Sequence, residues 1–241
     1  MKARKTVFTA TLVLALVIVV VVGVLLLTKK TPAVAPPATS ISASDKNAPA
    51  SLVAAARAVG FHPTTEAGVG EIESKPASAA NPPTNPDLLK VGTTAPAFTL
   101  KTPTGQKVSL SQFRGKATLL EFFATWCPHC NAEAPHLRTL AEALPTSKYA
   151  FVSVNADGET APSVFAFHLY YGLPYPALVD PSSHPGSFNS SGAAGPVSTK
   201  YQVESFPTFY VIAPSGKIAW ASDGEQPDAL LRQELVKAAR A

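Results

Sequence analysis

The chain has 241 residues, 46% of them hydrophobic, and a formal net charge of +4 at pH 7; this length suits one or two domains. The excess positive charge lies in residues 1–90, which hold nine Lys and Arg against five Asp and Glu, whereas residues 91–241 hold eleven of each kind. Because the basic residues flank an apolar segment and form no stripe interleaved with aromatic residues, the composition argues against a nucleic-acid partner.

The first predicted element is a membrane-spanning signal-anchor at residues 7–28. Its apolar run, Val7 to Leu27, carries no charge and is long enough to cross a hydrocarbon core of about 30 Å. A cleavable signal peptide is an alternative, although its apolar region would be shorter and the candidate cleavage site at 33–35 is followed by Pro36. A buried core helix is a third. More basic residues precede the span than follow it, so residues 1–6 are expected in the cytoplasm and the remainder outside the cell membrane.

A linker rich in Pro, Ala and Ser is predicted at residues 29–90, because such a composition buries little apolar area and stays extended or disordered. Within it, residues 50–63 could form two or three helical turns before Gly60, which we interpret as a transient helix. A second stretch rich in Gly, Ser and Pro, residues 181–200, predicts an exposed loop. That loop is interpreted as a tolerated insertion, with contact to a partner as the alternative.

Residues 91–241 have the pattern of a single globular domain. Short apolar runs rich in aromatic and β-branched residues alternate with helical segments, which predicts an α/β fold with helices packed around one sheet. The expected strands are a pair on either side of Gly105, then 117–124, 149–156, 176–180 and a hairpin around 214–216. The expected helices are 128–144, 161–172 and 227–241.

The only two cysteines, Cys127 and Cys130, stand three positions apart. Structural zinc would need four ligands, and no second Cys pair exists; His129 lies between the cysteines, where it cannot easily share their metal. Covalent haem attachment would need a histidine at position 131, which is Asn131. An inert pair of buried thiols is the third alternative, but a redox dithiol that forms a Cys127–Cys130 disulfide explains more. No metal or cofactor is predicted.

The expected local fold gives the two cysteines different roles. A strand followed by a helix that begins near Pro128 puts Cys127 at a helix N-terminus, where unpaired N–H groups and the helix dipole lower a thiol pKa. Pro128 suits the first helical turn. Cys130, one turn on, should be more buried and should resolve mixed disulfides. His129 adds a donor and partial positive charge beside the thiolate, which stabilises the reduced form and makes the disulfide a stronger oxidant.

An acidic residue, Glu121, interrupts the apolar run of the strand six positions before Cys127. On a strand Glu121 shares a face with Phe123 and not with Phe122. A carboxyl buried beneath the cysteines would have a raised pKa and could take the proton from Cys130 and return it. The alternative is a glutamate at the edge of the strand that reaches solvent.

The stretch FFATWCPHCNAEAP resembles the thioredoxin superfamily, with Trp126 before the first cysteine and Pro135 five residues after the second, where helices of that family kink. The resemblance implies a thioredoxin-like fold, a central mixed sheet flanked by helices. It also implies a cis-proline at Pro207 opposite the disulfide. In this family the backbone of the residue before that proline, here Phe206, pairs with the substrate chain.

Two subfamilies contribute to the resemblance. Residues 91–127 are similar to the TlpA/ResA type of membrane-anchored, extracytoplasmic thiol–disulfide oxidoreductase, whereas the EFF and CPHC stretches resemble the active site of the dithiol oxidase DsbA. The resemblance implies an enzyme that exchanges disulfides with exported proteins and is reset by a membrane or extracytoplasmic redox partner. The Pro128-His129 dipeptide favours a dithiol oxidase, which is the expected direction. The alternative is a reductase or isomerase, because the TlpA/ResA type is often reducing, for example in cytochrome c maturation.

Two other classes are less favoured. A peroxidase of the peroxiredoxin type would need a threonine three residues before the reactive cysteine, where this chain has Ala124. A non-catalytic binding module with a structural Cys127–Cys130 disulfide is the other, but a bridge across three positions closes too small a loop to stabilise much.

Overall fold

The computed structural model describes residues 47–64, 87–182 and 195–241, all of which fall within one compact unit, Pro37–Ala241. The predicted signal-anchor at 7–28 and most of the predicted linker lie outside the described residues. Among the described residues, no helix combines the length and the apolar character needed to cross a membrane.

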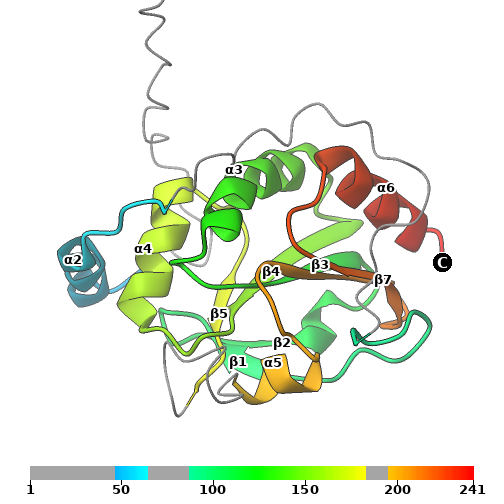
Figure 1. The fold of residues 1–241 in the computed structure, drawn as a ribbon, viewed down its shortest axis with the longest axis horizontal. Helices are drawn as coiled ribbons and strands as arrows, with labels where there is room; N and C mark the ends of the chain where they lie inside the picture. The colour runs from blue at the N-terminus through cyan, green and yellow to red at the C-terminus, as the bar shows by residue number, and fades with distance from the viewer. Residues whose placement is uncertain (1–46, 65–86, 183–194) are drawn as a thin grey trace, which may run out of the picture. The chain divides into compact units, whose positions relative to one another are not determined.

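A seven-stranded mixed sheet forms the centre of the domain, with the strand order β2-β1-β5-β4-β3-β6-β7 (Figure 1). The three strands β3, β4 and β5 run parallel, and all other pairings are antiparallel. The predicted mixed sheet is therefore confirmed. The strands are β1 Thr99–Lys101, β2 Lys107–Ser109, β3 Ala117–Phe123, β4 Tyr149–Asn155, β5 Ala177–Val179, β6 Thr208–Ile212 and β7 Ile218–Asp223.

Helices flank this sheet on both sides (Figure 1). Helix α3 contacts both α4 and α6 on one side, and the short helix α5 lies on the other. The helices are α2 Ala50–Val59, the 3-10 helix η1 Leu110–Phe113, α3 Pro128–Ala143, α4 Ala161–Tyr171, α5 Pro196–Lys200 and α6 Asp228–Ala238. The predicted α/β class with one sheet is confirmed, and the longer expected helices begin and end within a few residues of the observed ones.

Strand β3 lies at the centre of the core, and all seven of its residues are buried. Its side chains alternate between the two faces of the sheet, as strand geometry requires. Phe123 packs against Phe167 of α4, with ring centroids 4.9 Å apart, while Phe122 packs against Tyr201 beyond α5 at 5.1 Å. Glu121, two residues before Phe123, therefore lies on the face that α3 and α4 cover.

The segment at 50–63, predicted to be a transient helix in a linker, is a packed helix in the structure. Helix α2 forms there and packs against α4, with Ala56 only 3% exposed. Its small alanine side chains allow the two helix backbones to approach closely, and Phe61 follows directly after the left-handed Gly60 that ends the helix. The segment is thus part of the folded unit.

The predicted loop at 181–200 also differs in part. Its last residues form helix α5, while its central residues, 183–194, lie outside the described residues. The buried side chain of Asp180 accepts a hydrogen bond of 2.7 Å from the backbone N–H of Ser198. A carboxylate at a helix N-terminus satisfies backbone donors that would otherwise be unpaired, which fixes α5 against the end of the sheet.

Candidate active site

The two cysteines lie where β3 passes into α3. Cys127 is the N-cap residue of α3, and Pro128 occupies the first helical position. Both cysteines are free thiols; Cys127 is 4% exposed and Cys130 is fully buried. The structure therefore places Cys127 at the helix N-terminus and Cys130 one turn further inside.

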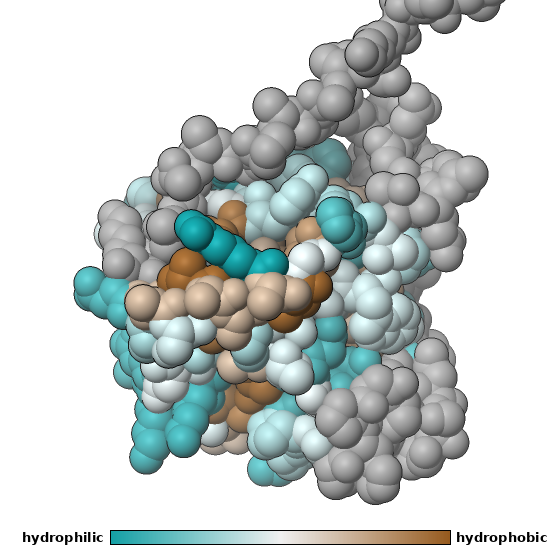
Figure 2. Space-filling model, turned by 90° about the vertical axis from the view of Figure 1, so that its left-hand side faces the viewer, coloured by the Kyte–Doolittle hydropathy of each residue, from teal (hydrophilic) through white to brown (hydrophobic). Residues whose placement is uncertain are grey.

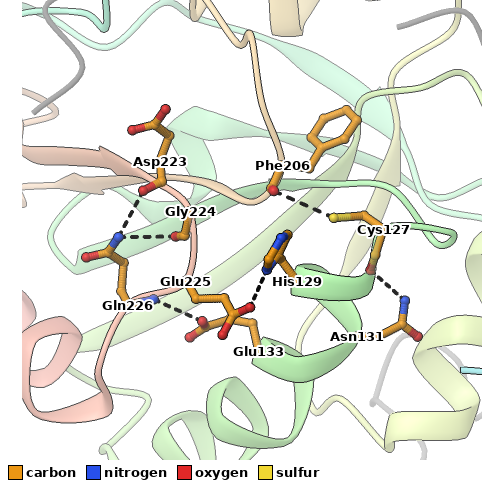
Figure 3. A network of polar contacts seen from close by, with 9 residues as sticks. All are labelled: Cys127, His129, Asn131, Glu133, Phe206, Asp223, Gly224, Glu225 and Gln226. Carbon is orange, nitrogen blue, oxygen red and sulfur yellow. Dashed lines mark hydrogen bonds and ion pairs between the residues drawn. The ribbon is translucent and has the colours of Figure 1, made fainter. Parts of the chain in front are cut away.

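Cys127 is surrounded by hydrogen-bond donors that stabilise its thiolate. A hydrogen bond from the Cys130 side chain, together with the backbone N–H groups of Cys130 and His129 and the charge of His129, lowers the pKa of Cys127 to about 7, although burial opposes the shift. The Cys127 thiol itself donates to the backbone oxygen of Phe206 over 3.6 Å (Figure 3). At neutral pH a sizeable fraction of Cys127 is consequently thiolate and able to attack a disulfide.

Cys130 has the opposite properties. Burial raises its pKa well above the ordinary value, and the hydrogen bond to Cys127 and the negative charges of Cys127 and Glu121 act in the same direction. Two thiols one helical turn apart are thus kept in different protonation states. Such a separation suits a nucleophile and a resolving thiol that ionises only when a base accepts its proton.

Glu121 is only 3% exposed, so the alternative interpretation, a glutamate that reaches solvent, is wrong. Burial, and secondarily the charge of Cys127, raises the pKa of Glu121 to about 8. In the sheet Glu121 lies between Ser153 of β4 and Phe209 of β6, which exclude water from both sides. A carboxyl with such a pKa can exchange a proton with Cys130 near neutral pH.

A second buried carboxyl, Glu133, was not anticipated from the sequence. It lies on α3 three residues after Cys130, is fully buried, and accepts a hydrogen bond of 3.1 Å from the backbone N–H of Gln226 (Figure 3). Burial raises its pKa well above the ordinary value, and the charge of Glu121 adds to the shift. The spacing of three from Cys130, which places both on one face of a helix, is the one signal that could have indicated it.

His129 points toward the loop between β7 and α6. Its Nδ1 forms an ion pair with the carboxylate of Glu225 (Figure 3). The same loop contacts the cis-proline segment, because the Gly224 N–H donates to the Pro207 oxygen over 2.8 Å. The Phe206–Pro207 peptide bond is cis, as predicted. Residues 223–226 therefore contact both the CPHC motif and the cis-proline segment.

Trp126 and its neighbour Thr125 are held by the loop after β4. The Trp126 indole N–H donates to Asp157 over 2.7 Å, and the Thr125 backbone N–H donates to Glu159 over 2.7 Å. Trp126 is 46% exposed and meets the Phe206 ring edge-on, with centroids 6.1 Å apart. An exposed Trp126 ring, packed on the buried Phe206 ring, thus lies beside Cys127, where an incoming polypeptide could pack.

No group of three or more His, Cys, Asp or Glu side chains among the described residues could hold a metal ion. The arrangement around Cys127 and Cys130 suits thiol chemistry, with one thiol of lowered pKa, one of raised pKa, and the buried carboxyl of Glu121 in electrostatic contact with both. The second buried carboxyl, Glu133, interacts electrostatically with Glu121.

Comparison with known proteins gives the same chemistry. The AhpC/TSA family matches residues 91–221. Thiol-disulfide oxidoreductase ResA of Bacillus thuringiensis subsp. konkukian is 29% identical over 154 residues, 64% of this chain and 82% of the relative. Thioredoxin-like protein YneN of Bacillus subtilis is 32% identical over 149 residues, 61% of this chain and 79% of the relative.

Solved structures share the fold. A crystal structure from Chlorobium tepidum, assigned as thiol:disulfide interchange protein DsbE, superposes with a TM-score of 0.53 at 25% identity and covers 63% of this chain and 99% of its own. The thioredoxin-like fold is therefore shown, and the family match includes the whole β3–α3 unit that carries both cysteines. The chain belongs to the AhpC/TSA family as a redoxin of the TlpA/ResA type, and it is a thiol–disulfide oxidoreductase.

Proposed function

We propose that this enzyme exchanges disulfides with exported proteins while anchored to the cell membrane by residues 7–28. The observation that carries the exchange role is the position of Cys127, whose reactive thiol lies beside the Phe206 oxygen and the exposed Trp126 ring. A substrate chain that pairs with the backbone of Phe206 would bring its disulfide directly to Cys127. The sequence supports the anchor through its 21-residue uncharged run at 7–27.

The local electrostatics favour reduction of substrate disulfides over their formation. A pKa of about 7 for Cys127 equals that of thioredoxin, about 7, and lies well above the value of about 3.5 for DsbA. In addition, His129 is paired with the Glu225 carboxylate, which partly neutralises its charge. The Phe206 oxygen accepts a hydrogen bond that only the protonated thiol can donate. Each feature limits the stabilisation of the thiolate and so keeps the dithiol reducing.

Dithiol oxidation is the second candidate, and His129 is the observation that favours it. The imidazole and the backbone N–H of His129 both lower the pKa of Cys127, and a stabilised thiolate makes the disulfide more oxidising. A reductase would need a membrane or extracytoplasmic donor of electrons, whereas an oxidase would need an acceptor.

The reduction potential of the full-length protein in detergent micelles distinguishes the two directions. We expect a value near that of thioredoxin, about −270 mV, because the thiolate is only moderately stabilised. Equilibration with glutathione or dithiothreitol buffers, read by alkylation of Cys127, measures it. A value near about −120 mV would contradict the reductase and establish the oxidase.

The orientation across the membrane can be tested with single cysteines in a Cys127→Ser, Cys130→Ser background. Glu142→Cys places a thiol at an exposed position of α3, since the Glu142 side chain is 48% exposed, and Ala3→Cys marks the segment expected in the cytoplasm. In intact cells a membrane-impermeant maleimide should label position 142 and leave position 3 unlabelled until the cells are lysed. The reverse labelling pattern would contradict the proposed localisation.

A further inference from the structure

The active-site turn, Thr125–Cys127, is held in place by the buried amide of Asn131. Asn131 Nδ2 donates to the backbone oxygen of Cys127 over 2.7 Å and to that of Thr125 over 2.9 Å (Figure 3 shows the first bond). Both donors of the amide are thereby used on the two ends of one turn. Neither Asp nor Leu, which are close to it in size, could donate these bonds.

The acceptor of the same amide is occupied from a different helix. The hydroxyl of Tyr171, the last residue of α4, donates to Asn131 Oδ1 over 2.8 Å in a buried position. This bond fixes the orientation of the Asn131 amide. The oxygen must face the Tyr171 hydroxyl, so both N–H groups of the amide face the turn. Burial, followed by the charges of Tyr170 and Cys130, raises the pKa of Tyr171, so its hydroxyl stays protonated and donates.

The ring of Tyr171 is packed in turn by the segment that precedes the domain. Phe61 meets the rings of Phe167, Tyr170 and Tyr171 edge-on, at centroid distances of 5.5, 5.4 and 6.2 Å. Helix α2, which precedes Phe61, packs on α4. Figure 2 shows this side of the molecule, where apolar and hydrophilic residues are mixed. The α2 segment, residues 50–61, precedes the region matched by the AhpC/TSA family, residues 91–221.

We propose that the α2 segment positions the active-site turn, acting through Tyr171 and Asn131, and so sets the reactivity of Cys127. Phe61 packs the Tyr171 ring, the Tyr171 hydroxyl orients the Asn131 amide, and the amide holds both carbonyl groups of the turn. Residues 50–61, which precede the region matched by the family, are therefore part of the exchange machinery. These are positioning residues, because none of them touches the sulfur of Cys127.

The chemical consequence follows from the backbone donors at Cys127. The N–H groups of His129 and Cys130 stabilise the thiolate only while the turn keeps the sulfur above the end of α3. If the turn relaxes, the sulfur moves away from these donors, and the thiolate becomes less stable. Loss of the Tyr171 hydroxyl on α4 should thus raise the pKa of the Cys127 thiol at the start of α3.

The test is the pH dependence of Cys127 alkylation in the full-length protein, followed by mass spectrometry so that Cys127 and Cys130 are distinguished. Tyr171→Phe keeps the ring and removes the hydroxyl. We expect its alkylation at pH 6 to fall about three- to tenfold, as the loss of one hydrogen bond implies, with the midpoint of the profile moved to higher pH. Phe61→Ala should shift the midpoint in the same direction by less.

Tyr170→Phe is the matched control, because the Tyr170 ring also contacts Phe61, yet no hydrogen bond joins its hydroxyl to the active-site turn within the described residues. Its profile should equal that of the wild type. If Phe61→Ala fails to fold, Phe61→Leu keeps most of the volume without the ring contacts. Lowered unfolding temperatures with an unchanged pH profile in Tyr171→Phe and either Phe61 variant would overturn the proposal. The alkylating reagent reacts with Cys127 without a substrate protein or redox partner. The result is therefore independent of the direction of disulfide exchange in the cell.

Discussion

Replacing Cys130 with alanine is expected to lengthen the lifetime of mixed disulfides at Cys127 by about a thousandfold or more. Cys130 lies one helical turn away and its side chain is hydrogen-bonded to Cys127, so it attacks as an intramolecular thiol. Effective molarities of well-oriented groups exceed by far the millimolar thiol concentrations that would replace it. Acid trapping followed by non-reducing gels and mass spectrometry should show adducts between the variant and exported proteins.

The matched control is Cys127→Ala, which retains Cys130. Because Cys130 is fully buried and its pKa is raised, this variant should form no adducts. Equal amounts of adduct at both cysteines would contradict the assignment of Cys127 as nucleophile. An absence of adducts in Cys130→Ala would contradict exchange with exported proteins.

Replacing Glu121 with glutamine is expected to slow resolution by Cys130 about a hundredfold above pH 8, as is usual when a general base is removed. The pKa of Glu121 is about 8, so the wild-type rate should rise with pH as the carboxylate forms. Glutamine cannot accept the proton, and this rise should disappear from the profile. Stopped-flow measurement of tryptophan fluorescence during reaction with a peptide disulfide measures the rate.

The same substitution should make the protein more stable at alkaline pH. The carboxyl of Glu121 has a pKa of about 8 in the fold, whereas an exposed glutamate carboxyl has a pKa of 4.5. A folded-state pKa above the unfolded value gives stability that is present below about pH 4.5 and lost as the pH rises toward 8. Glutamine removes this loss, so Glu121→Gln should gain roughly 3–5 kcal/mol in the free energy of unfolding at pH 8.5 and little at pH 4.

Glu142→Gln serves as the control for both measurements, since Glu142 lies on the exposed face of α3. It should change the free energy of unfolding by about 0.5 kcal/mol or less at either pH. If Glu121 is a buried acid that transfers protons, Glu121→Gln should both slow resolution by Cys130 and raise the free energy of unfolding at pH 8.5. A variant that is slower and less stable at pH 8.5 would point to loss of packing instead.

The sequence predicted the central strand, the active-site helix and the different burial of the two cysteines because these depend on neighbouring residues. The apolar run of β3 ends before Cys127, and Pro128 marks the start of a helix, so strand, turn and helix could be placed from one short stretch. Glu121 was detectable for the same reason, since a charge in an apolar strand is conspicuous.

Residues that support the site from a distance were not predicted. Glu133 and Asn131 are ordinary polar residues in a helix until the fold buries them, and Asp157 follows a strand as many surface carboxylates do. The helical turns of α2 were predicted, but its stable packing was not, because an alanine-rich segment has a weak apolar pattern and the stability of α2 comes from packing on α4. Contacts between segments far apart in the chain are set by topology, which single-sequence patterns do not encode.

The contacts of the active-site turn also bear on how such a motif can be transferred between proteins. Thr125 and Trp126 are held by Glu159 and Asp157, and the carbonyl oxygens of the turn by Asn131, which depends on Tyr171. Grafting CPHC alone onto another redoxin would leave the β4–α4 supports behind. The chemical character of Cys127 therefore belongs to a set of segments that have to be exchanged together.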